Sequence, residues 1–256
     1  MLIDTHAHLC DPSFDEDRAA VLKRARDTGV VAVVSVSETV ADFAKNLDLA
    51  GEFPELVRPA AGLFPTVLDS TAADEVVAMA RANSDRLFAI GEVGLDLWKV
   101  QDAAGRELQA EIFRRFVDLS IELDLPLNVH SRAAGRPTID LLLESGACRV
   151  QLHAFDGRAA KALPALEAGF FFSVPPSVVR SVQKQKLVRR LPLDSLLVET
   201  DSPVLGPDAQ ARNEPANVTV VVRAIAELKN VSVADIEAAV TENTIRLYGD
   251  RIIAGT

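Results

Sequence analysis

The chain has 256 residues, 48% of them hydrophobic and 25% charged, and a formal net charge of −10. The apolar content is enough for a sizeable core and excludes a disordered chain, and no apolar run approaches the roughly 20 residues of a membrane-spanning helix. The acidic balance argues against broad binding of nucleic acid through a basic face, although bound cations can supply positive charge locally.

Short apolar runs typical of β-strands alternate with longer helical patterns along the whole chain. Several of these runs are apolar without interruption, as expected of parallel strands whose two faces are both covered. The expected strands are Leu2–His6, Val30–Val36, Val57–Leu63, Leu87–Glu92, Leu125–His130, Val150–His153, Gly169–Val174 and Leu196–Thr200.

Helical patterns fill the gaps, and four segments carry the clearest signals. They are Asp17–Thr28, Arg106–Leu123, Ile139–Ser145 and a last helix from Ser232 to about Tyr248. The first and third are followed by glycines, Gly29 and Gly146, which readily adopt the left-handed conformation at a helix end. The second repeats apolar residues along one face, and Ser232 with Asp235 has the spacing of a capping box.

Eight strands alternating with helices predict a closed (β/α)₈ barrel, an α/β fold of the TIM type, which typically needs about 250 residues. We expect one domain over residues 1–256, because no linker, repeat or low-complexity segment divides the chain. A doubly wound open sheet is the structural alternative. In a barrel, the active site would lie at the carboxyl ends of the strands.

All four histidines of the chain lie at, or just past, the end of an expected strand. His6 and His8 are two positions apart, so an extended backbone points both imidazoles to the same side. His130 and His153 end the fifth and sixth strands. Because these strand ends meet at one mouth of a barrel, we expect the four imidazoles to share a metal site.

Two carboxylates follow apolar strands in the same way. Glu92 ends the fourth strand and Asp201 follows the eighth, and either would be costly to bury without a partner. A salt bridge or a helix cap would explain each one alone, but beside four histidines we expect them to be metal ligands. Six ligands suit two divalent ions, Mg, Mn or Zn, that share one carboxylate. We expect Glu92 to be that bridge, and Asp201 to orient or deprotonate the attacking water.

Six segments, in order along the chain, carry a family signature. They are Asp4–Leu9, Ile90–Asp96, Leu125–Arg132, Leu152–Phe155, Leu197–Pro203 and Arg212–Asn217. At these segments the sequence resembles the TatD family of metal-dependent deoxyribonucleases, within the amidohydrolase-like barrel superfamily. The resemblance implies a (β/α)₈ barrel and a divalent-metal nuclease that often removes nucleotides from single-stranded DNA ends, with a catalytic role for Asp201. It also implies metal ligation by His6, His8, Glu92, His130, His153 and Asp201.

Three positions depart from the family pattern. Phe64 stands where family members usually carry histidine, so a phosphate contact made by that histidine would be missing here. Cys10 replaces a common aspartate and Asp156 a common serine. These changes leave the expected ligands intact, but the family's substrate preference does not transfer directly to this chain, and a divergent activity is easier to accommodate. Cys10 and Cys148, the only cysteines, are expected to be buried free thiols, because two cysteines form neither a disulfide framework nor, at this spacing, a metal motif.

Other residues near the expected mouth have two interpretations each. Arg132 could clamp a substrate phosphate or form a structural ion pair, and Trp98 could stack on a base or simply pack. The loop Arg212–Glu214 could close the edge of the site or be anchored by its own hydrogen bonds. A basic stretch could guide a DNA strand or be a solvated helix face; it contains Arg180, Lys184, Lys186, Arg189 and Arg190.

Three functions follow from these observations. The first is hydrolysis of DNA phosphodiesters, with single-stranded DNA as the expected partner. The second keeps the metal site but changes the bond, to an amide, lactone, phosphotriester or aminoacyl ester; many such barrels bridge their metals with a lysine, and Glu92 in that place favours the first. The third, a non-enzymatic metal-stabilised scaffold, is disfavoured because structural zinc sites are closed by four ligands. We expect no membrane association, no obligate protein partner and, without a signal peptide, a cytoplasmic location.

Overall fold

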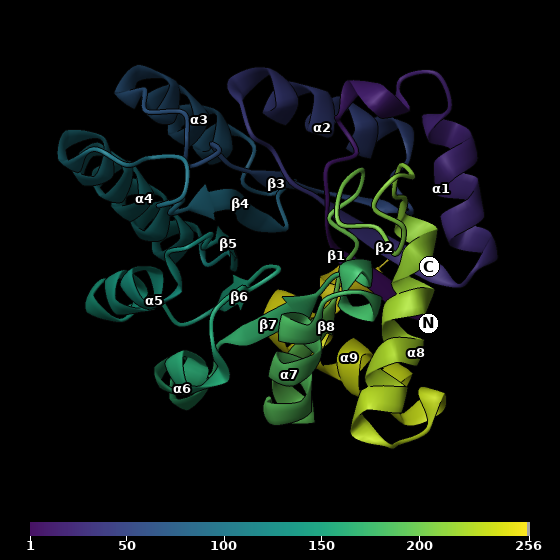
Figure 1. The fold of residues 1–256 in the computed structure, drawn as a ribbon. Coiled ribbons are helices and arrows are strands. Elements are labelled where there is room, and N and C mark those ends of the chain that lie inside the picture. The colour runs from purple at the N-terminus through teal and green to yellow at the C-terminus, as the bar shows by residue number, and fades with distance from the viewer. Residues whose placement is uncertain (255–256) are drawn as a thin grey trace.

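The eight apolar runs form eight parallel strands, each paired with the next one along the chain. The computed structural model describes residues 1–254 and is drawn in Figure 1. The strands are β1 (Leu2–Ala7), β2 (Val30–Ser35), β3 (Val57–Ala61), β4 (Ala89–Gly94), β5 (Leu127–His130), β6 (Val150–Leu152), β7 (Phe171–Val174) and β8 (Leu196–Val198).

Hydrogen bonds just beyond β8 join the last strand to the first. The backbone N–H of Asp201 donates to the carbonyl of His6, and the N–H of His8 donates to the carbonyl of Ser202, each at 2.8 Å. The sheet is therefore a closed ring, which confirms the (β/α)₈ barrel and excludes the doubly wound open sheet. The ring closes at residues that were expected to bind metal.

Helices cover the outside of the barrel (Figure 1); the first seven connect successive strands, and the last two follow β8. They are α1 (Arg18–Asp27), α2 (Val40–Glu52), α3 (Ser70–Ala82), α4 (Ala103–Leu123), α5 (Gly135–Glu144), α6 (Ala159–Glu167), α7 (Val182–Arg190), α8 (Val218–Lys229) and α9 (Val233–Tyr248). Ser232 caps α9, since its hydroxyl accepts from the N–H of Asp235 at 3.1 Å. The Asp235 carboxylate accepts from that hydroxyl at 2.7 Å rather than from the backbone N–H of Ser232, so only half of the predicted capping box forms. In the part of the chain described, no helix is both long and apolar enough to cross a membrane.

Element ends differ from the expected ones by a few residues. The fourth strand begins at Ala89 and continues to Gly94, so Glu92 lies within β4 rather than at its end. The second expected helix begins three residues earlier, because Asp102 accepts from the N–H of Gly105 and caps it there. The helix expected from Ile139 begins at Gly135. Hydrophobic periodicity places an element well, but caps and neighbours decide where it starts.

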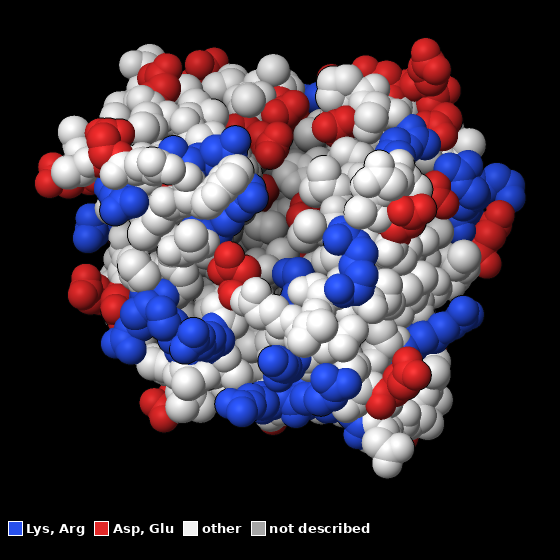
Figure 2. Space-filling view, viewed as in Figure 1, with Lys and Arg blue, Asp and Glu red and all other residues white. Residues whose placement is uncertain are grey.

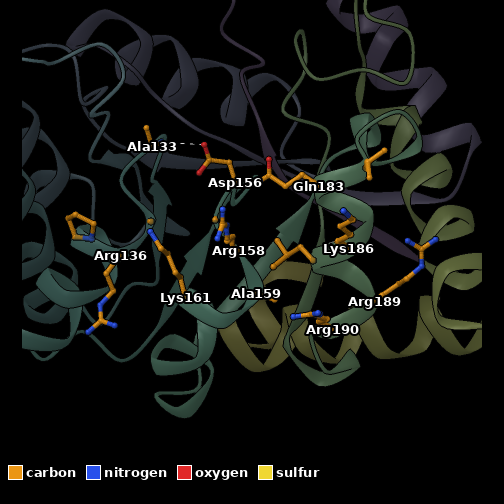
Figure 3. Close-up of a pocket in the computed structure, with 15 residues that line it drawn as sticks. Ala133, Arg136, Asp156, Arg158, Ala159, Lys161, Gln183, Lys186, Arg189 and Arg190 are labelled. Carbon is orange, nitrogen blue, oxygen red and sulfur yellow. Dashed lines mark hydrogen bonds between the residues drawn. The ribbon is translucent and has the colours of Figure 1, made fainter.

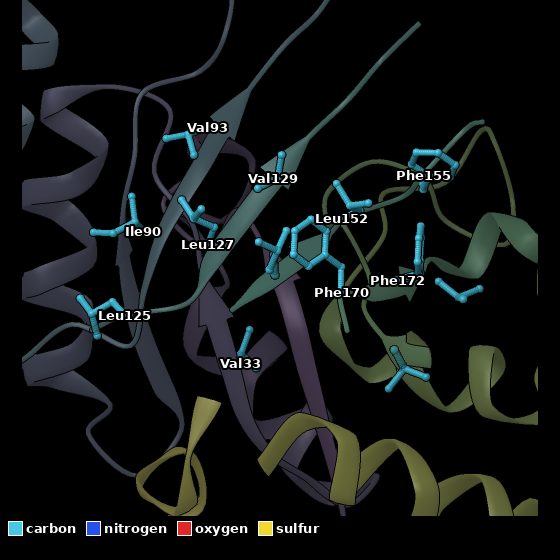
Figure 4. Close-up of a cluster of buried hydrophobic side chains, with 14 of the residues drawn as sticks. Val33, Ile90, Val93, Leu125, Leu127, Val129, Leu152, Phe155, Phe170 and Phe172 are labelled. Atoms are coloured by element: carbon cyan, nitrogen blue, oxygen red, sulfur yellow. The ribbon is translucent and has the colours of Figure 1, made fainter. Parts of the chain in front are cut away.

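Two apolar layers hold the barrel together. On β2, Val33 points outward into the layer between strands and helices, part of which Figure 4 shows. Ala32 and Val34, its neighbours, point into the barrel, because successive side chains of a strand face opposite ways. Tyr248 at the end of α9 joins the inner layer. The Nε–H of Arg58, near the start of β3, donates to the carbonyl of Ile252 at 2.9 Å, so the carboxyl-terminal segment covers the amino-terminal end of the barrel.

Helix α4 provides a direct test of the outer layer. Phe116 is fully buried, whereas Ile121 on the same helix is 50% exposed. We expect Phe116→Ala to lower the free energy of unfolding by about 3–5 kcal/mol, since it removes a large buried ring and leaves a cavity. The matched variant Ile121→Ala should change it by no more than about 0.5 kcal/mol. Urea unfolding followed by circular dichroism measures both, and equal effects would contradict the assigned helix face.

Candidate metal centre

The six expected ligands converge at the carboxyl ends of the strands. His6, Glu92 and His130 belong to β1, β4 and β5. His8, His153 and Asp201 follow β1, β6 and β8 within three residues. Every one of these six side chains is at least 88% buried. The barrel therefore brings together residues that are up to 195 positions apart in the chain.

Glu92 occupies the centre of the group. Its Oε1 lies 2.7 Å from Nδ1 of His130 and 2.8 Å from Nε2 of His153. Its Oε2 faces the other way, 3.5 Å from Nε2 of His8 and 3.8 Å from Nε2 of His6. Each carboxylate oxygen thus faces a different pair of imidazoles.

Asp201 completes the first of these two groups. Its Oδ1 lies 3.2 Å from Nε2 of His8 and 3.5 Å from Nε2 of His6. The backbone of Asp201 has φ of 52°, in the left-handed region, and its N–H is bonded to the carbonyl of His6. The turn after β8 therefore aims this carboxylate back at the histidines of β1.

Close packing of β4 against β5 sets the distance between Glu92 and His130. Gly94 has φ of +146°, and a Cβ atom there would lie 2.0 Å from the carbonyl oxygen of His130. Only glycine permits this approach. On β5, Leu127 and Val129 face the helices while Asn128 and His130 face the interior, as the alternation of a strand requires.

The donor set fits divalent cations. Nε2 of His6 and Nε2 of His8 are 3.3 Å apart, and Nδ1 of His130 and Nε2 of His153 are 3.2 Å apart. Lone pairs that face each other at this distance need a proton or a cation between them. Oε2 of Glu92 is buried and has no hydrogen-bond partner among the described residues. Three overlapping groups place their ligand atoms within 4.8 Å of one another: His6, His153 and Asp201; His6, His8 and Glu92; and Glu92, His130 and His153.

Mutual interactions shift the pKa values of the ligands. Burial would raise the pKa of Glu92, but His153 and His130 hold it well below its usual value. Burial lowers the pKa of His6, yet the bond to Asp201 and the charge of Glu92 raise it to about 10. Burial also lowers the pKa of His130, but its bonds to Asp96 and Glu92 raise it to about 9. Without metal, the carboxylates of Glu92 and Asp201 are ionised at neutral pH, and the imidazoles of His6 and His130 are protonated.

Three supporting residues were not identified from the sequence. Oδ1 of Asn128 lies 2.8 Å from Nδ1 of His6, which leaves Nε2 of that ring as the ligand atom. Oδ2 of Asp96 lies 3.2 Å from Nε2 of His130. A local signal existed for Asn128, because it precedes His130 by two positions and so shares its strand face. Asp96 lies beyond β4 and belongs to the family segment Ile90–Asp96, but no strand pattern indicated a role for it.

Glu199 is the third of them. Its Oε1 accepts the N–H of Ala154 at 2.8 Å, and its Oε2 accepts the hydroxyl of Ser173 at 2.5 Å. Burial raises its pKa to about 7. Because Ala154 directly follows His153, Glu199 anchors the turn that presents this ligand.

The sequence matches the model of one protein family, described as TatD related DNase, over residues 3–249. The chain belongs to the TatD family. It is 44% identical to the human protein named deoxyribonuclease TATDN3, over 96% of this chain and 94% of that protein. It is also 34% identical to a Bacillus subtilis protein named uncharacterized metal-dependent hydrolase YabD, over 97% of this chain and 99% of that protein.

Solved structures agree with this membership. The TatD homologue YJJV from Escherichia coli superposes with a TM-score of 0.89 at 28% identity, over 96% of this chain and 97% of that one. A phosphotriesterase homology protein from Escherichia coli, with phosphate in its active site, has a TM-score of 0.67 at 14% identity and shares the fold alone. The family resemblance seen in the sequence is therefore confirmed.

Residues around the mouth distinguish this TatD protein. Arg132 is exposed and makes no ion pair among residues 1–254; its guanidinium lies 3.9 Å from the ring centre of Trp98. Trp98 is 51% exposed, so packing does not cover it. Phe64 contacts the ring of His130 edge-on, with centroids 5.1 Å apart. An aromatic edge thus stands where the family usually has an imidazole.

The loop Arg212–Glu214 after β8 is anchored by its hydrogen bonds and an ion pair, which is one of the two interpretations of this segment. The Asn213 amide donates to the carbonyls of Thr200 and Val204 at 2.7 Å, and Arg212 pairs with Asp17 at 2.6 Å.

Of the cysteines, Cys10 is a buried free thiol as expected. Cys148 is exposed, so the expectation for it was wrong.

Metal uptake should release protons. Metals bind neutral imidazole, whereas His6 and His130 carry pKa values of about 10 and about 9 and are protonated at pH 7 in the metal-free protein. We expect release of about two protons at pH 7, with affinity rising as pH increases toward 9. Calorimetry with Zn²⁺ in buffers of different ionisation enthalpy measures it. His130→Gln should release about one proton fewer, and uptake without proton release would contradict these pKa values.

Asn128 should control metal affinity without touching the metal. Asn128→Leu removes the acceptor for Nδ1 of His6 and is expected to weaken binding by about 10–100-fold, as losses of such supporting bonds do. Asn128→Asp keeps an acceptor and should retain most of the affinity. Competition with a chromophoric chelator measures the metal affinity of the wild-type protein and of each variant. Asn83→Leu, at the end of α3, is the control, and equal affinities throughout would show that His6 needs no support.

Proposed function

We propose that this TatD-type deoxyribonuclease hydrolyses phosphodiester bonds at single-stranded DNA ends with two divalent metal ions, Mg, Mn or Zn. The observation that carries the proposal is Glu92, whose two oxygens face two separate imidazole pairs. One ion would be held by His6, His8, Glu92 and Asp201, and the other by Glu92, His130 and His153. Bound ions of this kind lower the pKa of water and stabilise charge on phosphoryl oxygens.

Asp201 is the proposed general base. Burial would raise its pKa, but bonds to His6 and His8 hold it well below the usual value, so the carboxylate is ionised at neutral pH. Its Oδ1 can then accept a proton from the attacking water. The new bond from water oxygen to phosphorus replaces the bond to the leaving nucleoside oxygen, which takes up a proton in turn.

Substrate contacts are proposed for the rim of the mouth. Arg132 makes no ion pair among the described residues, so its guanidinium is available to a phosphate. The half-exposed ring of Trp98 beside it can stack on a base of a single strand. The Phe64 side chain has no hydrogen-bond donor, so it offers none to a substrate phosphate. A single DNA strand as substrate, no obligate protein partner and a cytoplasmic location complete the proposal.

The role of Asp201 can be tested with a matched pair of variants. Asp201→Asn should lower kcat by on the order of 10²–10⁴-fold, because the amide cannot take the proton. Asp208→Asn removes an exposed carboxylate from the same loop and should leave kcat unchanged. The assay is release of nucleotides from a labelled linear single strand with Mg²⁺ or Mn²⁺, and chelation should stop it.

Circular single-stranded DNA and a panel of amide and carboxylic ester substrates complete the experiment. The circle should remain intact, because it has no end. Unchanged activity of Asp201→Asn would remove the mechanism. Cleavage of the circle would show that the enzyme cuts at internal sites rather than at DNA ends. Turnover confined to amides or carboxylic esters would show that the scissile bond is not a phosphodiester.

A further inference from the structure

A large groove lies between α5, α6 and α7, outside the ring of metal ligands. It has a volume of about 1220 Å³, more than the ~300–1,000 Å³ of small-molecule pockets. Six of its lining side chains are cations and one, Asp156, is a carboxylate. The cations are Arg136, Arg158, Lys161, Lys186, Arg189 and Arg190, and Figure 3 shows how they flank the groove. We call this the α5–α6–α7 groove.

Most of these cations have no acidic partner. Arg136 pairs with Asp140 at 2.7 Å, but the other five make no ion pair within the described residues 1–254. Unpaired arginines also occur elsewhere among the described residues, as Arg114 on α4 shows, so the absence of a partner does not by itself mark the groove. What marks it is that six cations and one carboxylate line a single groove of a chain with 27 basic and 37 acidic residues. Figure 2 shows Lys and Arg gathered over α5, α6 and α7, while acidic surface gathers over α1 to α4.

The inner end of the groove adjoins the metal centre. Ala133 and Asp156 line it, and each lies three residues after a ligand, His130 and His153 respectively. Three residues span at most about 10–11 Å of chain. The N–H of Ala133 donates to Oδ2 of Asp156 at 3.3 Å, which ties the two turns together. A polymer that continues from the metal centre past Ala133 and Asp156 therefore enters the groove.

The floor of this inner end has a fixed shape. The buried ring of Phe155 fills it from below. A Cβ atom at Gly157 would lie 2.4 Å from that ring, and one at Gly135 would lie 2.8 Å from it. Neither glycine lies in the left-handed region, so close packing against the ring accounts for both. Gly135 and Gly157 thus let the backbone of the groove wall lie directly on the Phe155 ring.

We propose that the α5–α6–α7 groove binds the phosphodiester backbone of the nucleic-acid strand that continues beyond the nucleotide at the metal centre. The proposal deepens the proposed function and rests on it. Unpaired Lys and Arg neutralise phosphates and release the counterions condensed on a strand. Their arrangement over three helices suits an extended polyanion, and the adjacent metal centre makes a phosphodiester the polyanion favoured over an acidic protein. The net charge of −10 then confines strand binding to this track.

Binding is tested without metal, so that cleavage plays no part. Lys186→Gln with Arg190→Gln neutralises one wall of the groove, and Arg158→Gln with Lys161→Gln neutralises the other. Arg114→Gln with Arg223→Gln is the control, because both arginines are exposed on α4 and α8, outside the groove. Fluorescence anisotropy in EDTA gives the Kd of a labelled strand of 20 thymidylates and of a dinucleotide, across salt concentrations. Circular dichroism confirms that each variant is folded.

Either groove pair should raise the Kd for the long strand by on the order of tenfold and lower the slope of log K against log salt by about 1.4, since two single-strand phosphate contacts are lost. The control pair and the dinucleotide should show no change. Equal weakening by groove and control variants would overturn the proposal. So would polyglutamate that displaces the strand at matched charge, because it would assign the groove to acidic proteins.

Kinetics on the same proteins separate the two proposals. If the groove variants raise KM for long strands only and keep kcat, both proposals stand. If the wild-type protein cleaves DNA but the groove variants match it at every strand length, the groove proposal fails and the nuclease stands. If wild-type protein binds the long strand through the groove but cleaves no DNA with any metal, the proposed function fails and the groove still binds a strand.

Discussion

The Glu92 carboxylate is the contact on which the rest of the site depends. It is buried among four imidazoles, and each of its oxygens faces a different pair of them. A buried carboxylate without compensation would be protonated, yet the surrounding histidines hold its pKa well below the usual value. The same interaction raises the pKa of His6 and His130. Without metal, the six side chains form a charged cluster held together by protons, and divalent ions can replace those protons.

Polar groups below the ligands connect this cluster to the floor of the barrel. Asn128 bonds to His6 and lies 3.3 Å from the hydroxyl of Tyr248. That hydroxyl donates to Gln151 at 2.6 Å, and Gln151 in turn donates to Ser173 at 2.9 Å. Each buried donor thus finds an acceptor, which makes a polar layer inside an apolar barrel tolerable. Tyr248, at the end of α9, is thus linked through these bonds to the candidate ligand His6.

Charge is distributed unevenly over the molecule, and this reconciles an acidic protein with an anionic substrate. Some surface arginines are neutralised by carboxylates, as Arg115 is by Glu111 and Asp74. Near the mouth, positive charge is left at Arg132 and in the α5–α6–α7 groove, and divalent ions would add to it. Screening confines the influence of exposed charges to roughly 8–10 Å at physiological salt, so local charge near the mouth outweighs the distant acidic surface.

The sequence alone predicted the barrel, which the structure confirms, and six candidate ligands, which the structure brings together. Both rest on local information: apolar runs and helical periodicity recur along the chain, and a polar residue at the end of an apolar run is visible without a fold. Only the tertiary structure decided that Glu92 lies within β4 and which of its oxygens faces which histidines. It also revealed Asp96, Glu199 and the groove. These features depend on strand register and ring closure between segments far apart in the chain, which no local pattern specifies.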